Sequence, residues 1–129
     1  MRTLFTLAMP LALASLASGC VAAAAGAAAV IISQDVIDNN VYVATLDRDA
    51  DQVWASAKVA LSHASPRPYE VQDDVRKAIA DVDDAKVTVT VETYDLNRST
   101  LRVSARKFGV NNGAIAKMVY DKILQELDR

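Results

Sequence analysis

Cysteine and histidine are almost absent from this chain of 129 residues, which contains one of each, Cys20 and His63. A single cysteine cannot form a disulfide within the chain, so the folded part must be held together by packing. A single histidine cannot build a metal site of several histidines, and alone it does not make an active site. We interpret His63 as an exposed residue at a helix end, where it interacts with the helix dipole.

Neither sign of charge dominates the chain. There are 16 acidic residues and 14 basic ones, which gives a formal net charge of -2, and the basic residues form no block. Proteins that bind nucleic acid carry a basic patch for the phosphates, so we expect no nucleic-acid partner. Hydrophobic residues make up 52% of the sequence, but much of this share lies in the N-terminal leader and the alanine-rich segment after it. We expect no cofactor.

The first 19 residues are typical of a secretory signal. Arg2 gives a positive start, and the apolar run at residues 4–16 is too short for an ordinary membrane-spanning helix. Two other interpretations stay open: a cleaved signal followed by a chance cysteine, or an uncleaved anchor helix that continues to Ile32. Pro10 argues against one long straight helix. An unpaired Cys20 would be a liability in an oxidising compartment unless it were modified.

The end of the leader resembles the lipobox of bacterial lipoproteins. In a lipobox, a branched apolar residue and two small residues precede a cysteine that is lipidated and becomes the new N-terminus. Ser18-Gly19-Cys20 fits this pattern, although Ala17 stands where a branched residue is usual. The resemblance implies a membrane anchor on Cys20. Two or three acyl chains attached there would hold the protein in the membrane essentially permanently. Val21 after the cysteine implies sorting to the outer membrane, facing the periplasm.

Three segments are expected. Residues 1–19 are the signal, residues 20–40 carry the lipidated cysteine on a tether rich in alanine and glycine, and residues 41–129 form one small domain. The alanine-rich part of the tether either lies near the lipid headgroups or is a spacer of low complexity.

The first half of the domain is predicted to contain a strand and a helix. Residues 41–46 alternate and are rich in strand formers, which predicts a strand. A helix is expected after Asp49, which stands three residues before Gln52 in the spacing of a capping box. The prolines at positions 66 and 68 end this helix. Its buried face is predicted to contain Ala50, Val53, Trp54, Ala57, Ala60 and Leu61.

The middle of the domain contains one segment with two possible structures, followed by two predicted strands. Apolar residues at helical spacing, with charges between them, leave both a helix and strands open for residues 70–82. Residues 86–94 alternate strongly and predict a strand, and residues 100–108 predict its antiparallel partner. Directly opposed residues share a face, so we expect Val91 opposite Val103, which places Glu92 opposite Arg102.

A last helix is expected after Gly109, with Asn111 or Asn112 as its cap. Its buried stripe is predicted to contain Ile115, Met118, Val119, Ile123 and Leu127. Two helices would then cover one face of a small antiparallel sheet of about four strands. The predicted fold is therefore an α+β two-layer sandwich.

The order of these features is itself informative. A lipobox and an alanine-rich stretch precede a short strand and a helix containing Val53-Trp54-Ala55-Ser56-Ala57. A strand of alternating valine and threonine follows, and then segments 102–109 and 116–123. This order resembles a family of small bacterial envelope lipoproteins classed as a domain of unknown function. The resemblance implies an α+β sandwich, strands within residues 70–82 and a membrane-anchored position in the periplasm; it supplies no catalytic residues.

Two acidic clusters and one aromatic residue are candidate binding groups. Asp73-Asp74 and Asp81 with Asp83-Asp84 could bind calcium, but they lack the spacing of a calcium loop, and we expect solvated turns. Trp54 could stack on a ligand, but it lies on the apolar stripe of its helix, and we expect it in the core.

Basic residues mark a candidate contact surface. Arg98, Arg102, Arg106 and Lys107 either form a positive stripe that touches lipid headgroups or the cell wall, or belong to an ordinary solvated face. We expect a non-enzymatic interaction or structural module of the cell envelope, whose partner is an envelope protein, peptidoglycan or lipid. The alternative is an envelope enzyme that cleaves glycan with paired carboxylates. The expected contact surface contains Thr88, Thr90, Arg102, Ser104 and Arg106.

Overall fold

The computed structural model of the protein describes residues 31–129, and the predicted signal, Cys20 and the alanine-rich segment lie outside the described residues. Among residues 31–129, no helix is long and apolar enough to cross a membrane. The elements in chain order are β1 (Ile31–Ile37), β2 (Val41–Leu46), α2 (Ala50–Ala64), β3 (Glu70–Gln72), β4 (Lys77–Val82), β5 (Ala85–Asp95), β6 (Arg98–Lys107), β7 (Val110–Asn111) and α3 (Gly113–Leu127).

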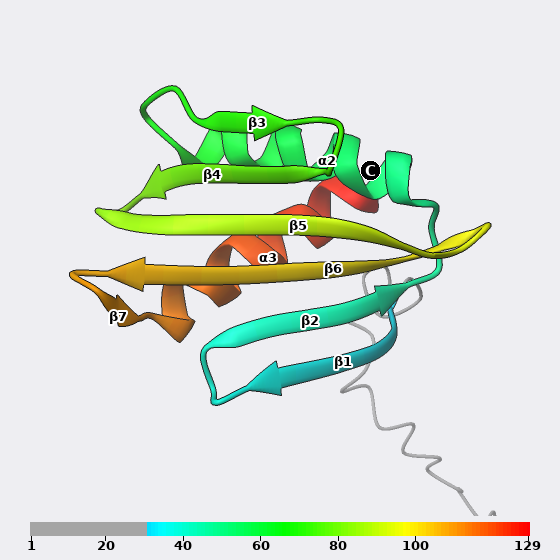
Figure 1. Cartoon of the computed structure of the whole chain (residues 1–129), viewed down its shortest axis with the longest axis horizontal. Coiled ribbons are helices and arrows are strands. Elements are labelled where there is room, and N and C mark those ends of the chain that lie inside the picture. Colours follow the sequence, from blue (N-terminus) through cyan, green and yellow to red (C-terminus); the bar gives the residue numbers. More distant parts are fainter. Residues whose placement is uncertain (1–30) are drawn as a thin grey trace, which may run out of the picture.

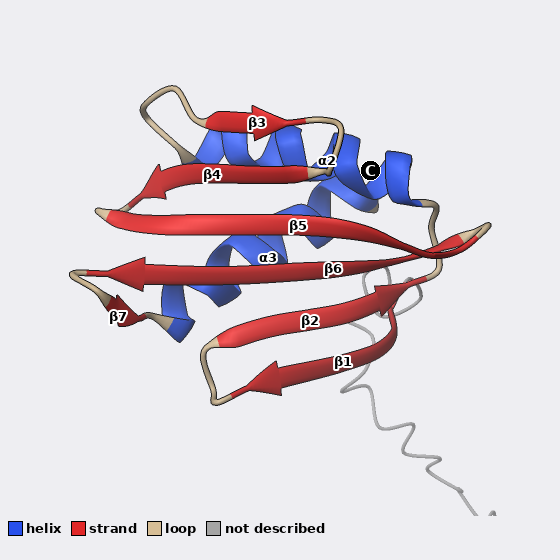
Figure 2. Cartoon of the chain, in the orientation of Figure 1, coloured by secondary structure: helices blue, strands red, loops and turns tan. Residues whose placement is uncertain are grey.

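The strands form one antiparallel sheet in the order β1-β2-β6-β5-β4-β3, with β7 paired to the C-terminal end of β6 (Figure 1). Helices α2 and α3 lie on one face of this sheet, and no other element of residues 31–129 covers the opposite face (Figure 2). The predicted α+β class is therefore confirmed. The sheet has seven strands, however, and is larger than the sheet of about four strands predicted from the sequence.

Strands that are short or exposed account for the difference between the seven strands observed and the four or so predicted. All side chains of β1, β3 and β7 are exposed apart from the half-buried Ile31. A strand that buries nothing shows no apolar alternation, so its sequence pattern does not reveal it. β1 also lies within residues 20–40, the segment predicted to be a tether, and pairs with β2. The sheet therefore begins at Ile31, before the domain boundary predicted at Val41.

The core lies between the sheet and the helices, and its centre is the pair β5–β6. The buried residues of these two strands alternate with residues that point away from the helices, as the sequence predicts. Three buried pairs form this centre: Val87 with Ala105, Val89 with Val103, and Val91 with Leu101.

The predicted register of β5 and β6 is wrong by two residues. Val91 lies opposite Leu101, whereas Val103 lies opposite Val89. Glu92 consequently lies opposite Thr100, and Arg102 opposite Thr90. A shift by two residues keeps every side chain on its face, so the apolar pattern could not distinguish the two registers.

The turn between β5 and β6 sets the register instead. The strands continue to Asp95 and Arg98, so that only Leu96 and Asn97 connect them, and the pairing is irregular between Thr93 and Asp95. The side chain of Asp95 accepts a hydrogen bond from the backbone N–H of Asn97 and forms an ion pair with Arg98. The interaction with the Arg98 guanidinium holds the pKa of Asp95 below its ordinary value.

Helix α2 follows the sequence prediction closely. Asp49 caps its N-terminus and accepts a hydrogen bond of 2.9 Å from the backbone N–H of Gln52. The helix ends at Ala64, directly before Ser65 and Pro66. All six residues predicted for its apolar stripe, including Trp54, are buried in the core.

Residues 70–82 form the hairpin β3–β4 and not a helix. The six residues of β4 alternate, and Ala78, Ala80 and Val82 are buried against the helices. Between the strands, Arg76 adopts a positive φ of 47°, which ends any helical path at that point. The strands left open by the sequence are therefore confirmed for this segment.

Helix α3 is capped by Asn112, whose side chain accepts a hydrogen bond of 3.1 Å from the backbone N–H of Ile115. Of the predicted stripe, four residues are buried and Met118 is only partly buried. Ala116, Tyr120 and Leu124 are also buried, so the apolar face is wider than predicted.

Gly113, the first residue of α3, lies against the turn between β1 and β2. A Cβ atom at this position would overlap the backbone carbonyl oxygen of Asn39 and lie 3.1 Å from the side-chain oxygen of Asn40. The glycine therefore allows the first hairpin to approach the helix, which makes β1 and β2 part of the same packed unit.

We predict that Gly113→Ala destabilises the domain by about 1–3 kcal/mol, although alanine favours a helix, because backbone atoms must shift to admit the new methyl group. Urea unfolding of the purified protein measures the change. Ala114→Gly, at the exposed neighbouring position, is the control and should cost only about 0.5–1 kcal/mol. An alanine at position 113 that leaves the stability unchanged or raises it would contradict the close approach.

Candidate binding surface

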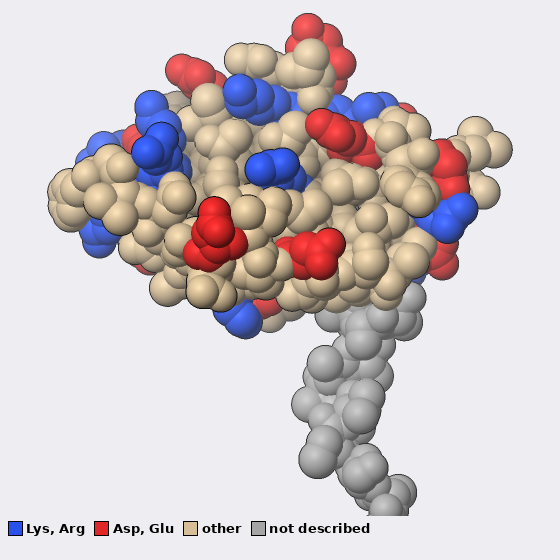
Figure 3. Space-filling view, turned by 60° about the horizontal axis from the view of Figure 1, so that its bottom comes forward, with Lys and Arg blue, Asp and Glu red and all other residues tan. Residues whose placement is uncertain are grey.

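The open face of the sheet carries the polar residues that alternate with the core residues of β5 and β6. The register places Thr88 opposite Ser104 and Thr90 opposite Arg102, with Arg106 further along β6. The structure thus brings together on one face the five residues that the sequence suggested for a contact surface. Figure 3, in which the β1 edge of the sheet comes forward and the open face is seen obliquely, shows basic and acidic side chains distributed among uncharged residues.

The basic stripe expected from the sequence is reduced to two residues. Arg102 and Arg106 are exposed on the open face, and neither forms an ion pair within residues 31–129. Arg98 pairs with Asp95 instead, which raises the pKa of the guanidinium. Lys107 follows Arg106 directly, so it points to the other side of the strand and lies over the ring of Phe108 at 5.8 Å.

Two lysines that the sequence analysis missed join the surface. Lys86 lies directly opposite Arg106. Lys77 lies opposite Thr90, which lies opposite Arg102, so Lys77 and Arg102 belong to the same cross-strand row. We call Lys77, Lys86, Arg102 and Arg106 the cation cluster. Like charges that are directly opposed on neighbouring strands destabilise a sheet. Lys86 and Arg106 form such a pair, which only the correct register could have revealed. Lys86 also lies opposite Asp81 of β4, whose carboxylate offsets part of the repulsion.

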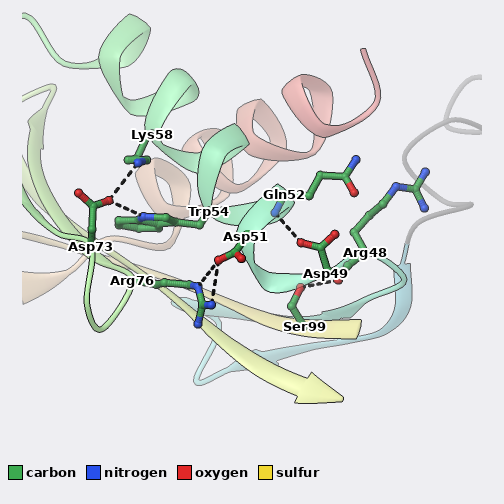
Figure 4. Close-up of polar contacts among 9 residues, drawn as sticks. All are labelled: Arg48, Asp49, Asp51, Gln52, Trp54, Lys58, Asp73, Arg76 and Ser99. Atoms are coloured by element: carbon green, nitrogen blue, oxygen red, sulfur yellow. Dashed lines mark hydrogen bonds and ion pairs between the residues drawn. The ribbon is translucent and has the colours of Figure 1, made fainter. Parts of the chain in front are cut away.

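A second polar group connects α2 to the turn between β3 and β4 (Figure 4). The indole N–H of Trp54 donates a hydrogen bond of 2.7 Å to Asp73, and Lys58 donates one of 2.9 Å to the same carboxylate oxygen. Arg76 donates two hydrogen bonds, of 2.9 and 3.1 Å, to Asp51 of α2. These contacts fix the turn against the helix, so Asp73 has a structural role beyond the solvated turn that was expected.

The two donors change the titration of Asp73. The hydrogen bonds from Lys58 and, to a lesser extent, Trp54 stabilise the carboxylate and lower its pKa below the ordinary value of 3.8. Because its pKa is lower in the folded state, the ionised Asp73 stabilises the folded domain, and this contribution is fully present above pH 3.8, the ordinary pKa of the group. That contribution is lost as the pH falls through the lower, folded-state pKa.

We predict that Asp73→Asn destabilises the domain at neutral pH, because asparagine keeps an acceptor oxygen but removes the charge that Lys58 faces. The difference from the wild-type protein should shrink as the pH falls below 3.8 and disappear below the lower, folded-state pKa of Asp73. Urea unfolding followed by Trp54 fluorescence between pH 7 and pH 2 measures it. Asp74→Asn is the matched control, and an equal effect of both changes at neutral pH would rule out the specific role of Asp73.

The other acidic cluster surrounds a shallow hollow of about 360 Å³, lined by Pro66, Arg67, Asp81, Asp83 and Asp84. Asp83 and Asp84 form the turn between β4 and β5 and are exposed, and Asp81 lies 4.0 Å from Arg67. Among residues 31–129, no three acidic, histidine or cysteine side chains come close enough together to hold a metal ion. The hollow is therefore a solvated acidic rim with one guanidinium.

His63 lies in the last turn of α2 and is exposed, as predicted. Its Nδ1 atom is 3.9 Å from a carboxylate oxygen of Glu126 on α3. No other ionisable partner of the ring is found in the described part of the chain, so the structure places His63 at a helix–helix contact.

No protein-family model matches the chain, and no similar curated protein was found. The resemblance to the envelope lipoprotein family therefore stays a prediction.

Proposed function

We propose that this protein is a lipoprotein anchored by Cys20 to the outer membrane, and that its domain faces the periplasm as a non-enzymatic interaction module. The open face of the sheet is its contact surface, and the partner presents anionic groups to the cation cluster. An envelope protein, peptidoglycan or lipid can supply such groups. The observation that supports this contact surface is the exposure of Arg102 and Arg106 on one open face, with Lys86 opposite Arg106 on the neighbouring strand.

The cation cluster is suited to an anionic partner for two physical reasons. Lys86 lies between Asp81 and Arg106, so one carboxylate faces two cations, whereas Arg106 lies between Lys86 and Asn111 and has no carboxylate directly opposite. A carboxylate or phosphate bound beside Arg106 offsets the remaining positive charge. Arg102 presents a planar guanidinium without an ion-pair partner in the described part of the chain, and this group binds carboxylates and phosphates with two parallel hydrogen bonds. Threonine and serine side chains between the cations supply further hydrogen bonds.

The alternative enzyme would have to use the acidic hollow, where Asp81, Asp83 and Asp84 stand near one another. Glycan cleavage needs one carboxyl that is kept protonated by an environment poor in water. The side chain of Asp81 is 49% exposed, and Asp83 and Asp84 are exposed residues of a turn. The open geometry of the hollow supports the interaction module over the enzyme.

We predict that the double variant Arg102→Glu/Arg106→Glu abolishes partner binding without unfolding the domain. Glutamate at position 106 stands opposite Lys86, and such a cross-strand pair adds about 0.2–1 kcal/mol of stability. The test is co-sedimentation of the detergent-solubilised full-length protein with purified peptidoglycan, together with affinity isolation from solubilised envelopes. Circular dichroism and urea unfolding report on the fold.

The control is a double reversal on the helical side of the molecule, Lys122→Glu/Arg129→Glu, which changes the net charge equally. Binding that the first variant loses and the control retains supports the open face. Binding that survives reversal of Arg102 and Arg106 would show that the contact surface lies elsewhere.

A further inference from the structure

One end of the sheet combines exposed apolar side chains with the entry of the chain into the domain. Ile31, the first residue of β1, lies opposite Leu46 at the end of β2, and Leu46 lies opposite Ser99 at the start of β6. Ser99 in turn lies opposite Thr93 of β5. The first residue of the sheet and the turn between β5 and β6 are therefore at the same end, as Figure 1 shows.

Three apolar residues are exposed at this end. Leu96 is 88% exposed at the tip of the turn, Tyr94 is 61% exposed beside it, and Ile32 is 50% exposed on β1. We call these three residues the apolar tip. Two-residue turns are usually occupied by glycine, asparagine or aspartate, and a leucine at such a position contributes nothing to the core. The tip therefore exposes apolar area that the fold does not require.

Charges near the apolar tip are nearly balanced. Asp95 and Arg98 flank the turn and form an ion pair, and Arg98 lies 5.4 Å from the centre of the Tyr94 ring. Further back, Asp47 and Asp49 stand beside Arg48, which leaves this end with three acidic and two basic residues. A surface with so little net charge is not held by electrostatic attraction, so any contact it makes depends on its apolar side chains.

The length of chain between Cys20 and β1 indicates that the apolar tip contacts the membrane. Only ten residues, 21–30, separate Cys20 from Ile31. The eleven Cα–Cα steps from Cys20 to Ile31 span at most about 36–40 Å even when fully extended, so lipid on Cys20 limits how far this end of the domain can lie from the bilayer. Tyrosine prefers the membrane–water interface, and a leucine beside it enters the boundary of the acyl chains.

We infer that the apolar tip rests on the membrane, with Leu96 and Tyr94 inserted into the interface of the bilayer that holds the anchor. This inference rests on the proposed lipidation of Cys20. It makes the anchor a two-point attachment, in which the acyl chains hold the protein and the tip fixes the orientation of the sheet. The opposite end, where Phe108 is also highly exposed, faces away from the bilayer.

The test places one fluorophore at either end of the sheet in the full-length protein. Leu96→Cys and Phe108→Cys are each purified from membranes, labelled with a thiol-reactive nitrobenzoxadiazole probe and reconstituted into vesicles of phosphatidylethanolamine and phosphatidylglycerol. Both positions are exposed, so the two probes are matched. The probe at position 96 should emit at shorter wavelength and be quenched by spin-labelled lipid at least about twofold more strongly than the probe at position 108. Raising the salt concentration should not change this result.

Two outcomes would overturn the inference. Equal quenching at both positions, or stronger quenching at position 108, would show that the apolar tip does not rest on the bilayer. The unsubstituted protein tests the anchor separately, because a lipidated Cys20 has no free thiol and takes up no probe. Labelling of the unsubstituted protein would contradict the proposed lipoprotein as well as the inference, whereas an unlabelled protein with an unquenched position 96 would contradict the inference alone.

Discussion

The alternation of β5 and β6 is the constraint on which the rest of the structure depends. Every second residue from Ala85 to Val91 of β5 and from Ser99 to Ala105 of β6 is buried, so the residues between them must point to the opposite face. Both helices lie on the core side, and residues 31–129 offer nothing that covers the other face (Figure 2). The same pattern that builds the core therefore collects Thr88, Thr90, Arg102, Ser104 and Arg106 on an open surface.

The elements with a buried face could be predicted from the sequence. The apolar stripe of α2, its Asp49 cap and the central strands all follow from periodicity and local hydrogen bonding. The exposed strand β1 could not, because its only contact with the core is the half-buried Ile31. The register between Val91 and Leu101 also escaped prediction, since a shift of two residues leaves the pattern unchanged and only the turn at Leu96 fixes it.

The candidate site, like the fold, could be predicted only in part from the sequence. Alternation placed Arg102 and Arg106 on one face, but the opposition of Lys86 to Arg106 depends on the register and was not foreseen. The bonds from Trp54 and Lys58 to Asp73 join residues 19 and 15 positions apart, and no local pattern encodes such contacts. With Leu96 at the bilayer, the strands would point away from the membrane and leave the cation cluster accessible from the periplasm.

The proposed function depends on one feature of the molecule, lipid on Cys20 that holds the domain at the membrane. Intact-mass analysis of the protein purified from membranes, compared with Cys20→Ser, tests this feature most directly. The proposed function predicts the mass of a chain that starts at Cys20 and carries acyl groups, and it predicts that the variant loses both the acyl groups and its membrane association. A mass without acyl groups, or a variant that stays in the membrane, would contradict it.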